Sequence, residues 1–488
     1  MRLGAPVLLA LLLAGCEVGP DFLRPDPPEA RGYTPGRLTQ TASASAATEG
    51  GAAQRFSEDL DIPGQWWALF HSAPLNALVE RALAANPDLQ AAQAALRVAL
   101  ENVRAGEGAF FPSVQGNVTG SRNKTASSIA PVPANNSLYY SLYTAQVSVS
   151  YSPDVWGLNR RTVESLTAQA EAQRFQLEAA YLTLTANVVG AAIQEASLRG
   201  QIAATEEIVK TEREVVGLLH RQEQLGQVAG LDVAAQEAAL AQAEAALPPL
   251  RKQLAQQRDL LTALAGGLPS VELAEKFDLA GRNLPQELPV SLPAKLVLQR
   301  PDLRQAEANL HAASAEIGVA VANRLPNIAL TANAGQTALT LDRLFAPGSN
   351  FWTVAGAVTQ PLFDGGVLLH KERAAREAFD EARAQYRSTL VKAFQNVADT
   401  LQALGADAAA LQAAAAAEQA ARTSLDITRK QLQLGAVNYL ALLNAEQTYL
   451  NAVVALAVAR GNRFADTAAL FQALGGGWWN RSDVVAAL

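Results

Sequence analysis

Residues that could do chemistry are few in this 488-residue chain, and their spacing argues against catalysis. The pair Ser121 and Lys124 fits the Ser-x-x-Lys pattern of acyl-serine enzymes, but the companion motifs of those enzymes are missing from the sequence. The sequence also lacks a glycine-rich loop that could cradle a phosphate. The histidines lack the spacing of a helical zinc site, and we interpret them as surface or packing residues: His71, His220, His311 and His370. We therefore predict that the protein is not an enzyme and uses no cofactor or metal ion.

The single cysteine, Cys16, offers a different chemistry. It follows an apolar run at positions 6–14, which is too short to span a bilayer, since that takes ~20 apolar residues. With Arg2 before it, this run has the form of a secretory signal, and Leu-Ala-Gly-Cys at 13–16 resembles a bacterial lipobox. We predict that residues 1–15 are a signal peptide and that Cys16 becomes an acylated N-terminus. An ordinary secretory signal with an incidental cysteine is the alternative.

Composition excludes several kinds of partner. The net charge is -7, charged residues make up 17% of the chain and no lysine-arginine run stands out, so we do not expect nucleic acid as a partner. Beyond the signal, no stretch reaches the length of a membrane-spanning helix, so any part of the mature chain that enters a membrane must do so as β-strands. Residues 16–65 are rich in proline, glycine and serine, which predicts a lipidated N-terminus and tether.

The rest of the chain is one unit that occurs twice. The sequence from residue 86 matches the sequence from residue 300 without a gap, pairing Leu89 with Leu303. Further along the chain, the segment around Gly226 matches the segment around Gly435. A self-similarity of this length indicates a duplicated structural unit. We predict a first repeat at 66–267, an inter-repeat segment at 268–300, a second repeat at 301–475 and a tail at 476–488.

Each repeat begins with a helix and continues into a β-hairpin, predicted at 113–152 and 327–362. Apolar and polar residues alternate in these segments, as where Val147 and Val149 share one face of a strand and Ser148 lies on the other. Aromatic residues collect at the strand ends, and the strands run ~10 residues, which favours a lipid-facing barrel over a soluble sheet packed on a core. Since a membrane barrel takes at least ~8 strands, four strands require more than one chain.

After its strands each repeat turns into a very long helix, predicted at 158–225 and 366–434 without a proline. At 1.5 Å per residue, each helix is ~100 Å long. Its apolar residues follow the three-four spacing of a coiled-coil seam. A glycine-bearing turn then reverses the chain into a return helix, at 231–264 and 439–474. The predicted fold class is α+β, with two long helical hairpins and two β-hairpins in an internally duplicated chain.

Several motifs resemble those of the TolC/OprM-type outer-membrane efflux proteins, especially the lipoprotein (NodT-like) branch: CEVGPDFLRP at 16–25, GQWWALFHSAPLNALVERALAANPDL at 64–89 and QPLFDGG at 360–366. The resemblance covers essentially the whole mature chain. It implies a homotrimer whose chains share a twelve-stranded β-barrel in the outer membrane of a Gram-negative bacterium. It also implies that the helical hairpins form a tunnel through the periplasm, and that residues 266–300, together with 66–85 and the segment after Gly475, form a belt around its middle.

The same resemblance implies a function. Family members receive drugs or other cargo from an inner-membrane pump through a periplasmic adaptor. We therefore expect a passive exit duct for small molecules, partnered with an adaptor, an RND-type pump and outer-membrane lipid. Exit ducts for type I protein secretion or for metal-ion efflux share the architecture and remain alternatives. A lipid-anchored structural protein, with coiled helices that bridge the periplasm and no channel, is the alternative from another class.

Family members hold the periplasmic tip closed with polar groups near the two turns, which gives five gate candidates: Gly226, Asp232, Gly435, Asn444 and Gln447. Chain reversal alone explains the glycines. Asp232 matches a carboxylate that rings the pore in the family, and capping of the return helix is its alternative role. Asn444 and Gln447 stand where the family commonly has an aspartate and an arginine, while Leu432 and Val437 replace a tyrosine and an arginine of other members. The resemblance thus implies a weaker latch and a less cation-selective constriction.

Overall fold

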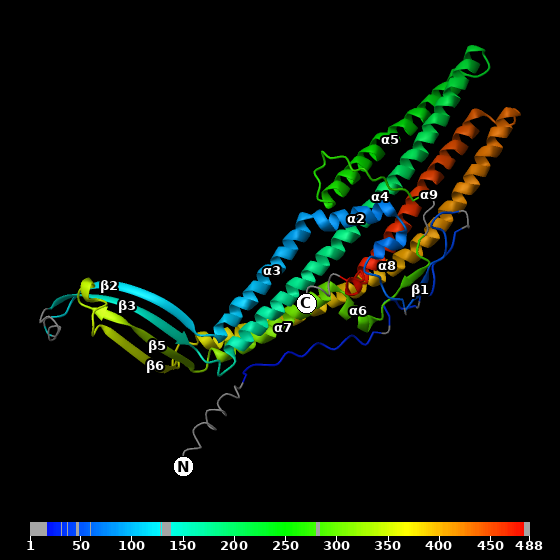
Figure 1. Cartoon of the computed structure of the whole chain (residues 1–488). Coiled ribbons are helices and arrows are strands. Elements are labelled where there is room, and N and C mark those ends of the chain that lie inside the picture. The colour runs from blue at the N-terminus through cyan, green and yellow to red at the C-terminus, as the bar shows by residue number, and fades with distance from the viewer. Residues whose placement is uncertain are drawn as a thin grey trace. The chain divides into compact units, whose positions relative to one another are not determined.

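The computed structural model describes residues 17–30, 32–36, 38–44, 48–58, 60–126, 128, 138–279 and 284–482. The helices and strands of this part of the chain are labelled in Figure 1. The chain divides into two compact units, each assembled from three stretches of sequence. Unit 1 contains residues 1–24, 95–173 and 306–386, and unit 2 contains residues 25–94, 174–305 and 387–488. The predicted signal peptide and Cys16 lie outside the described residues.

Unit 1 is centred on an antiparallel sheet with two strands from each repeat: β2 (Ser113–Lys124), β3 (Tyr139–Tyr151), β5 (Asn327–Ala338) and β6 (Asn350–Thr359). The strand order is β2-β3-β5-β6, and pairing of β3 with β5, with Val147 opposite Ala334, joins the two repeats (Figure 1). Apolar side chains of the alternating pattern are uncovered in the single chain, since Val118, Trp352 and Val354 are between 72% and 82% exposed. A soluble sheet would bury these side chains against a core, so their exposure favours the lipid-facing alternative.

Four long helices match the predicted hairpins: α4 (Leu158–Gln224), α5 (Gly230–Leu264), α8 (Val367–Gln433) and α9 (Tyr439–Ala473). Each of them begins and ends within one residue of its predicted range. α4 and α8 have 67 residues each, which corresponds to ~100 Å of helix. The helices before the strands are α3 (Pro87–Glu107) and α7 (Pro301–Ala322). In the described part of the chain, no helix combines the length and the apolar character needed to cross a membrane.

Unit 2 has an aromatic core to which both repeats contribute. Trp66, in η1 (Trp66–Phe70), stacks on Phe471 of α9 with 5.5 Å between ring centroids. The neighbouring elements are α2 (Ala73–Ala85), α6 (Pro293–Gln299) and η4 (Trp478–Asn480). The indole of Trp478 donates to the carbonyl oxygen of Gln299 (2.6 Å), which gives the one polar atom of that ring a partner. Segments that the sequence assigned to a belt thus pack in one unit.

The duplicated positions Asn86 and Arg300 have the same role in the two repeats, although they differ in residue type. Asn86 Nδ2 donates to the carbonyl oxygen of Leu264, the last residue of α5 (3.0 Å). Arg300 Nη1 donates to the carbonyl oxygen of Ala473, the last residue of α9 (2.8 Å). Each bond satisfies a carbonyl group that the end of a helix leaves unpaired. The helix junction is therefore repeated even where its side chains have diverged.

The N-terminal region differs from the predicted tether. β1 (Arg55–Ser57) pairs in parallel with β4 (Glu287–Pro289). Arg463 of α9, which is fully buried, donates to the carbonyl oxygens of Gly50 (2.8 Å) and Ala52 (2.9 Å). The segment at 48–58 is thus an integral part of unit 2 and not a free linker. Its composition suggested a tether because it has few apolar side chains, whereas its backbone carbonyl groups hold it to the fold.

Candidate functional site at the hairpin turns

The two turns that join the long helices to the return helices have the same geometry. In the first, Gly226 has a φ of +69°, its N–H donates to Glu223 O, and the N–H of Gln227 donates to Gln222 O, both at 2.8 Å. In the second, Gly435 has a φ of +72°, its N–H donates to Leu432 O (3.0 Å), and the N–H of Ala436 donates to Gln431 O (2.8 Å). This arrangement closes a helix C-terminus through a left-handed residue. An added Cβ would meet nothing within 4 Å at either glycine, so backbone conformation alone requires glycine.

Four leucines flank these turns at matched positions, and our sequence interpretation did not include them in the site. Leu225 and Leu231 flank the first turn, Leu434 and Leu440 flank the second, and their exposed fractions lie between 59% and 83%. The signal was present in the sequence, because the same pair recurs at the same place in both repeats. Apolar groups gathered on an exposed surface are typical of a contact with another protein.

Asp232 does not cap the return helix. The residue before α5 is Ala229, which makes no side-chain capping bond, and Asp232 lies within the first turn, where the helix dipole stabilises its charge. The capping alternative is therefore wrong, and the pore-lining role remains a prediction. Asn444 and Gln447 are exposed on α9, where Gln447 Nε2 donates to Asn451 Oδ1 (3.1 Å). In the described part of the chain, no hydrogen bond joins either side chain to the other hairpin.

One hydrogen bond that our sequence interpretation missed joins the two hairpins near the turns. The hydroxyl of Tyr439, in the first turn of α9, donates to Gln222 Oε1 near the end of α4 (2.8 Å). Burial raises the pKa of Tyr439, and the negative charge of Asp232 raises it further, so the hydroxyl keeps its proton. From the sequence we predicted a weaker latch at the tip, because Leu432 and Val437 replace a tyrosine and an arginine of other family members. The structure instead provides a tyrosine two residues beyond Val437.

A buried polar cluster joins the four long helices at some distance from the turns. Glu212 of α4 and Glu446 of α9 are each 3% exposed. Gln236 of α5 donates to Glu212, and Arg429 Nη2 of α8 donates to Glu446 Oε1 (3.3 Å). Burial raises the pKa of Glu212 to about 7, and the charge of Glu446 also raises it. Burial raises the pKa of Glu446 as well, although Arg429 opposes this. Two buried carboxyl groups so placed do not both ionise readily near neutral pH.

Paired helical hairpins and a sheet with exposed apolar side chains define a membrane-associated helix-and-strand protein with an internal repeat, and comparison with known proteins identifies its family. The family model described as outer membrane efflux protein matches residues 78–267 and 292–476. The chain belongs to the outer membrane efflux protein family. The two matched stretches fall largely in the two predicted repeats, as expected for an internal duplication.

Named relatives and solved structures agree with this family. The chain is 30% identical over 487 residues to the toluene efflux pump outer membrane protein TtgC of Pseudomonas putida, with 97% of this chain and 95% of that protein covered. It is 28% identical over 421 residues to the pyoverdine export outer membrane protein OpmQ of Pseudomonas putida, with 86% and 89% covered. The solved outer-membrane channel OprN matches with a TM-score of 0.82 and 27% identity, over 95% of this chain and 100% of that one.

The type of protein follows from the family and the fold. The chain is an outer-membrane efflux channel that extends into the periplasm, and it is not an enzyme. This confirms the resemblance, the fold class and the localisation that were predicted from the sequence. The acylation of Cys16 and the roles of the gate candidates remain predictions.

Proposed function

We propose that this chain forms a homotrimeric exit duct for small organic molecules in a tripartite efflux system. The observation that carries the proposal is the four-stranded sheet. Its outer strands β2 and β6 each pair with one neighbour among the described residues, and its apolar side chains are exposed. A free strand edge is unstable in a bilayer because its backbone groups lack hydrogen bonds, so we expect the edges to pair with those of other copies. Three copies would supply twelve strands, enough to close a barrel.

Small organic molecules are the proposed cargo. Two relatives with 30% identity are the toluene efflux pump outer membrane protein TtgC and the antibiotic efflux pump outer membrane protein ArpC, both of Pseudomonas putida. A passive duct takes its cargo from its pump, which we propose to be proton-driven and of the RND type. Export of proteins or metal ions would require a different pump, so identification of the pump decides between these alternatives.

The hairpin turns are the proposed docking surface for a periplasmic adaptor. Leu225, Leu231, Leu434 and Leu440 are exposed in the single chain. Full burial of one leucine contributes roughly 1.5–3 kcal/mol, so four leucines form a strong apolar contact. The hydrogen bond between Tyr439 and Gln222 supports a role for the same region in holding the tip closed.

Photocrosslinking in intact cells tests this proposal. A photoreactive phenylalanine would replace Leu434, and in a control it would replace Leu268, which is 73% exposed but distant from the turns in sequence. After irradiation, the tagged protein would be purified and its partners identified by mass spectrometry. We expect an adaptor from position 434 and not from position 268, and an RND pump with it. An adaptor of an ATP-driven exporter would indicate protein secretion, whereas recovery of neither would support the structural alternative.

We also propose that Cys16 is acylated and is the first residue of the mature chain. The support is its place after the predicted signal peptide. Mass spectrometry of the N-terminal peptide should show a diacylglyceryl group on Cys16. A mature N-terminus elsewhere, or a free thiol at Cys16, would reject the acylation without affecting the channel assignment.

A further inference from the structure

Residues 17–24, here called the N-terminal segment, are bound to unit 1 by a dense set of contacts. The N–H of Val18 donates to Trp156 O (3.2 Å), and Arg161 Nε donates back to Val18 O (3.1 Å). At the other end of the segment, Arg24 forms an ion pair with Glu307 of α7. Both ends of the segment are therefore attached, and channel formation as described above uses none of these contacts.

Arg161, in the first turn of α4, is the centre of the attachment. Its side chain is 3% exposed, and it pairs with Glu17 (3.3 Å), Asp21 (2.8 Å) and Glu164 (2.7 Å). Glu164 belongs to α4 itself, whereas Glu17 and Asp21 belong to the N-terminal segment. A buried charge is strongly unfavourable when its partners are removed. The segment thus supplies two of the three carboxylates that compensate this arginine.

Close packing also holds the N-terminal segment against α7. Gly19 has a φ of +98°, and a Cβ at this position would lie 2.4 Å from the Cα of Gly318 in α7. Phe22 stacks on the ring of His311, with 4.4 Å between centroids and 13° between the planes. His311 Nε2 in turn lies 2.9 Å from Glu164 Oε1. The N-terminal segment is thus held by three kinds of contact: the approach of two glycine backbones, an aromatic stack and several ion pairs.

We propose that α4 and α7 form a binding site for the N-terminal segment, and that this site holds the acylated N-terminus near the start of α4, beside the link from strand β3. The second half of this inference rests on the proposed acylation of Cys16. Covalent geometry places the Cα of Cys16 about 3.8 Å from that of Glu17. A Cβ at Gly157, in the link between β3 and α4, would lie 3.0 Å from the Glu17 side chain. Glu17, the residue that follows Cys16, therefore lies beside this link.

Docking of the segment restricts where the lipid anchor can reach. Tyr33, whose hydroxyl donates to Ser291 O (2.8 Å), is fixed to unit 2. If the residues before it were free, a flexible chain of about 17 residues would spread over roughly 20 Å. That distance is comparable to the ~30 Å hydrocarbon core of a bilayer. With the segment docked, the acyl chains and the strands are held at one level relative to each other.

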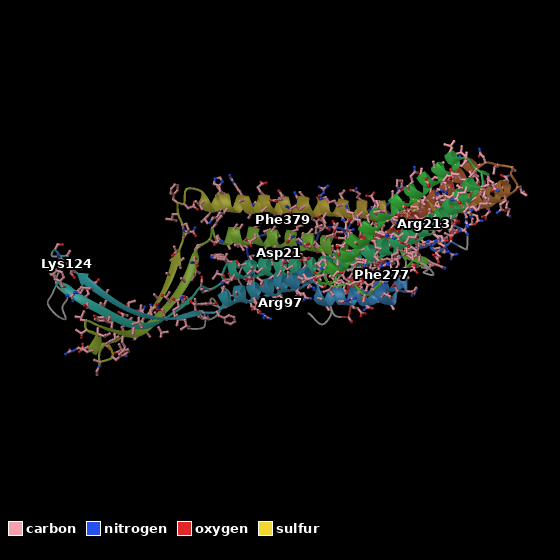
Figure 2. All side chains as sticks on the ribbon, turned by 90° about the horizontal axis from the view of Figure 1, so that it is seen from above. Asp21, Arg97, Lys124, Arg213, Phe277 and Phe379 are labelled. Atoms are coloured by element: carbon pink, nitrogen blue, oxygen red, sulfur yellow. The ribbon has the colours of Figure 1, made fainter. Side chains whose placement is uncertain are left out.

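Spin labelling at position 23 tests the proposal in the full chain in lipid vesicles. Leu23 is 84% exposed, so a nitroxide on Leu23→Cys reports the mobility of the segment without filling the site. Gly19→Val prevents the backbone contact, and Arg161→Ala removes the central cation. The matched controls are Gly32→Val, where an added Cβ meets nothing within 4 Å, and Arg97→Ala on the surface of α3. Asp21 of the segment and Arg97 are labelled in Figure 2.

We expect an immobilised spectrum and a single membrane depth in Leu23→Cys alone and in both controls. We expect loss of the immobilised component in Gly19→Val and in Arg161→Ala. Gly19→Val changes only the segment, so it keeps the test valid if Arg161→Ala does not fold. A label that remains immobilised in Gly19→Val, or that is mobile without any further change, would overturn the proposal. Failure of acylation gives a different result: Cys16, the only native cysteine, would then react with the spin label as a second thiol beside the one introduced at position 23.

Discussion

Replacement of Glu212 by glutamine should remove most of a pH dependence in the stability of the tip helices. Glu212 is buried among four helices, and its pKa is raised from 4.5 to about 7 in the folded chain. A carboxyl group whose folded-state pKa exceeds its unfolded value stabilises the fold fully below pH 4.5 and loses that effect as the pH rises through about 7. The helices around Glu212 should therefore open more readily at pH 8 than at pH 5.

The magnitude follows from the two pKa values. The difference between 4.5 and about 7 corresponds to roughly 3 kcal/mol, or about 300-fold in the opening equilibrium, of which about a hundredfold falls between pH 5 and pH 8. The other charged groups of the cluster are Glu446 and Arg429, and the repulsion from Glu446 adds to the effect of burial. Glutamine has nearly the same shape and can still accept from Gln236, but it cannot ionise. Glu212→Gln should therefore keep the packing of the protonated form at every pH.

Hydrogen exchange at pH 5 and pH 8, corrected for intrinsic rates, measures this opening directly. The amides that report it lie near Glu212 and Glu446. Glu214→Gln is the matched control, because Glu214 is exposed on the same helix. We expect protection to fall by about a hundredfold between the two pH values in the natural chain and in the control, and to fall much less in Glu212→Gln, where only Glu446 keeps a raised pKa. The same fall in Glu212→Gln, or protection that rises with pH in the natural chain, would refute the reasoning.

Four further substitutions test other parts of the fold. Tyr439→Phe removes the hydrogen bond to Gln222, worth about 0.5–1.5 kcal/mol, and should raise the fraction of open channels in planar bilayers. Gly435→Ala places a side chain at a φ of +72° and should lower the thermal stability of the tip by about 1–2 kcal/mol, measured by calorimetry. Arg463→Leu leaves buried carbonyl groups without donors and should cost roughly 3 kcal/mol, with cleavage near residue 50 in limited proteolysis. Asn444→Asp should increase cation selectivity in single-channel recordings, and unchanged selectivity would remove this residue from the constriction.

The backbone was predictable because its signals are local. α4 and α8 have no proline, the turn glycines mark their ends, and apolar residues alternate along the strands. Each of these signals acts within a few residues of the element that it defines. The duplication added a second, independent copy of most signals, which is why the helix bounds agree closely with the structure.

The buried polar groups could not be predicted from the same signals. Glu212, Glu446 and Arg463 are charged, and charged residues are almost never fully buried unless they are paired. Their partners lie on other elements, such as Gly50, which is 413 positions away from Arg463. A single sequence shows which face of a helix is apolar, but it does not show which two helix faces meet. Contacts of this kind therefore become visible only in the structure.

The two repeats keep the residues that determine the backbone and differ in those that join the hairpins. In the register of the two turn glycines, the counterparts of Tyr439 and Gln222 are Gly230 and Gln431. Glycine has no side chain, so the hydrogen bond between Tyr439 and Gln222 has no equivalent in that pair. In the proposed trimer, each hairpin meets one neighbour from its own chain and one from the next copy. Because the contact between chains lacks this bond, we expect that contact to separate first when the tip widens.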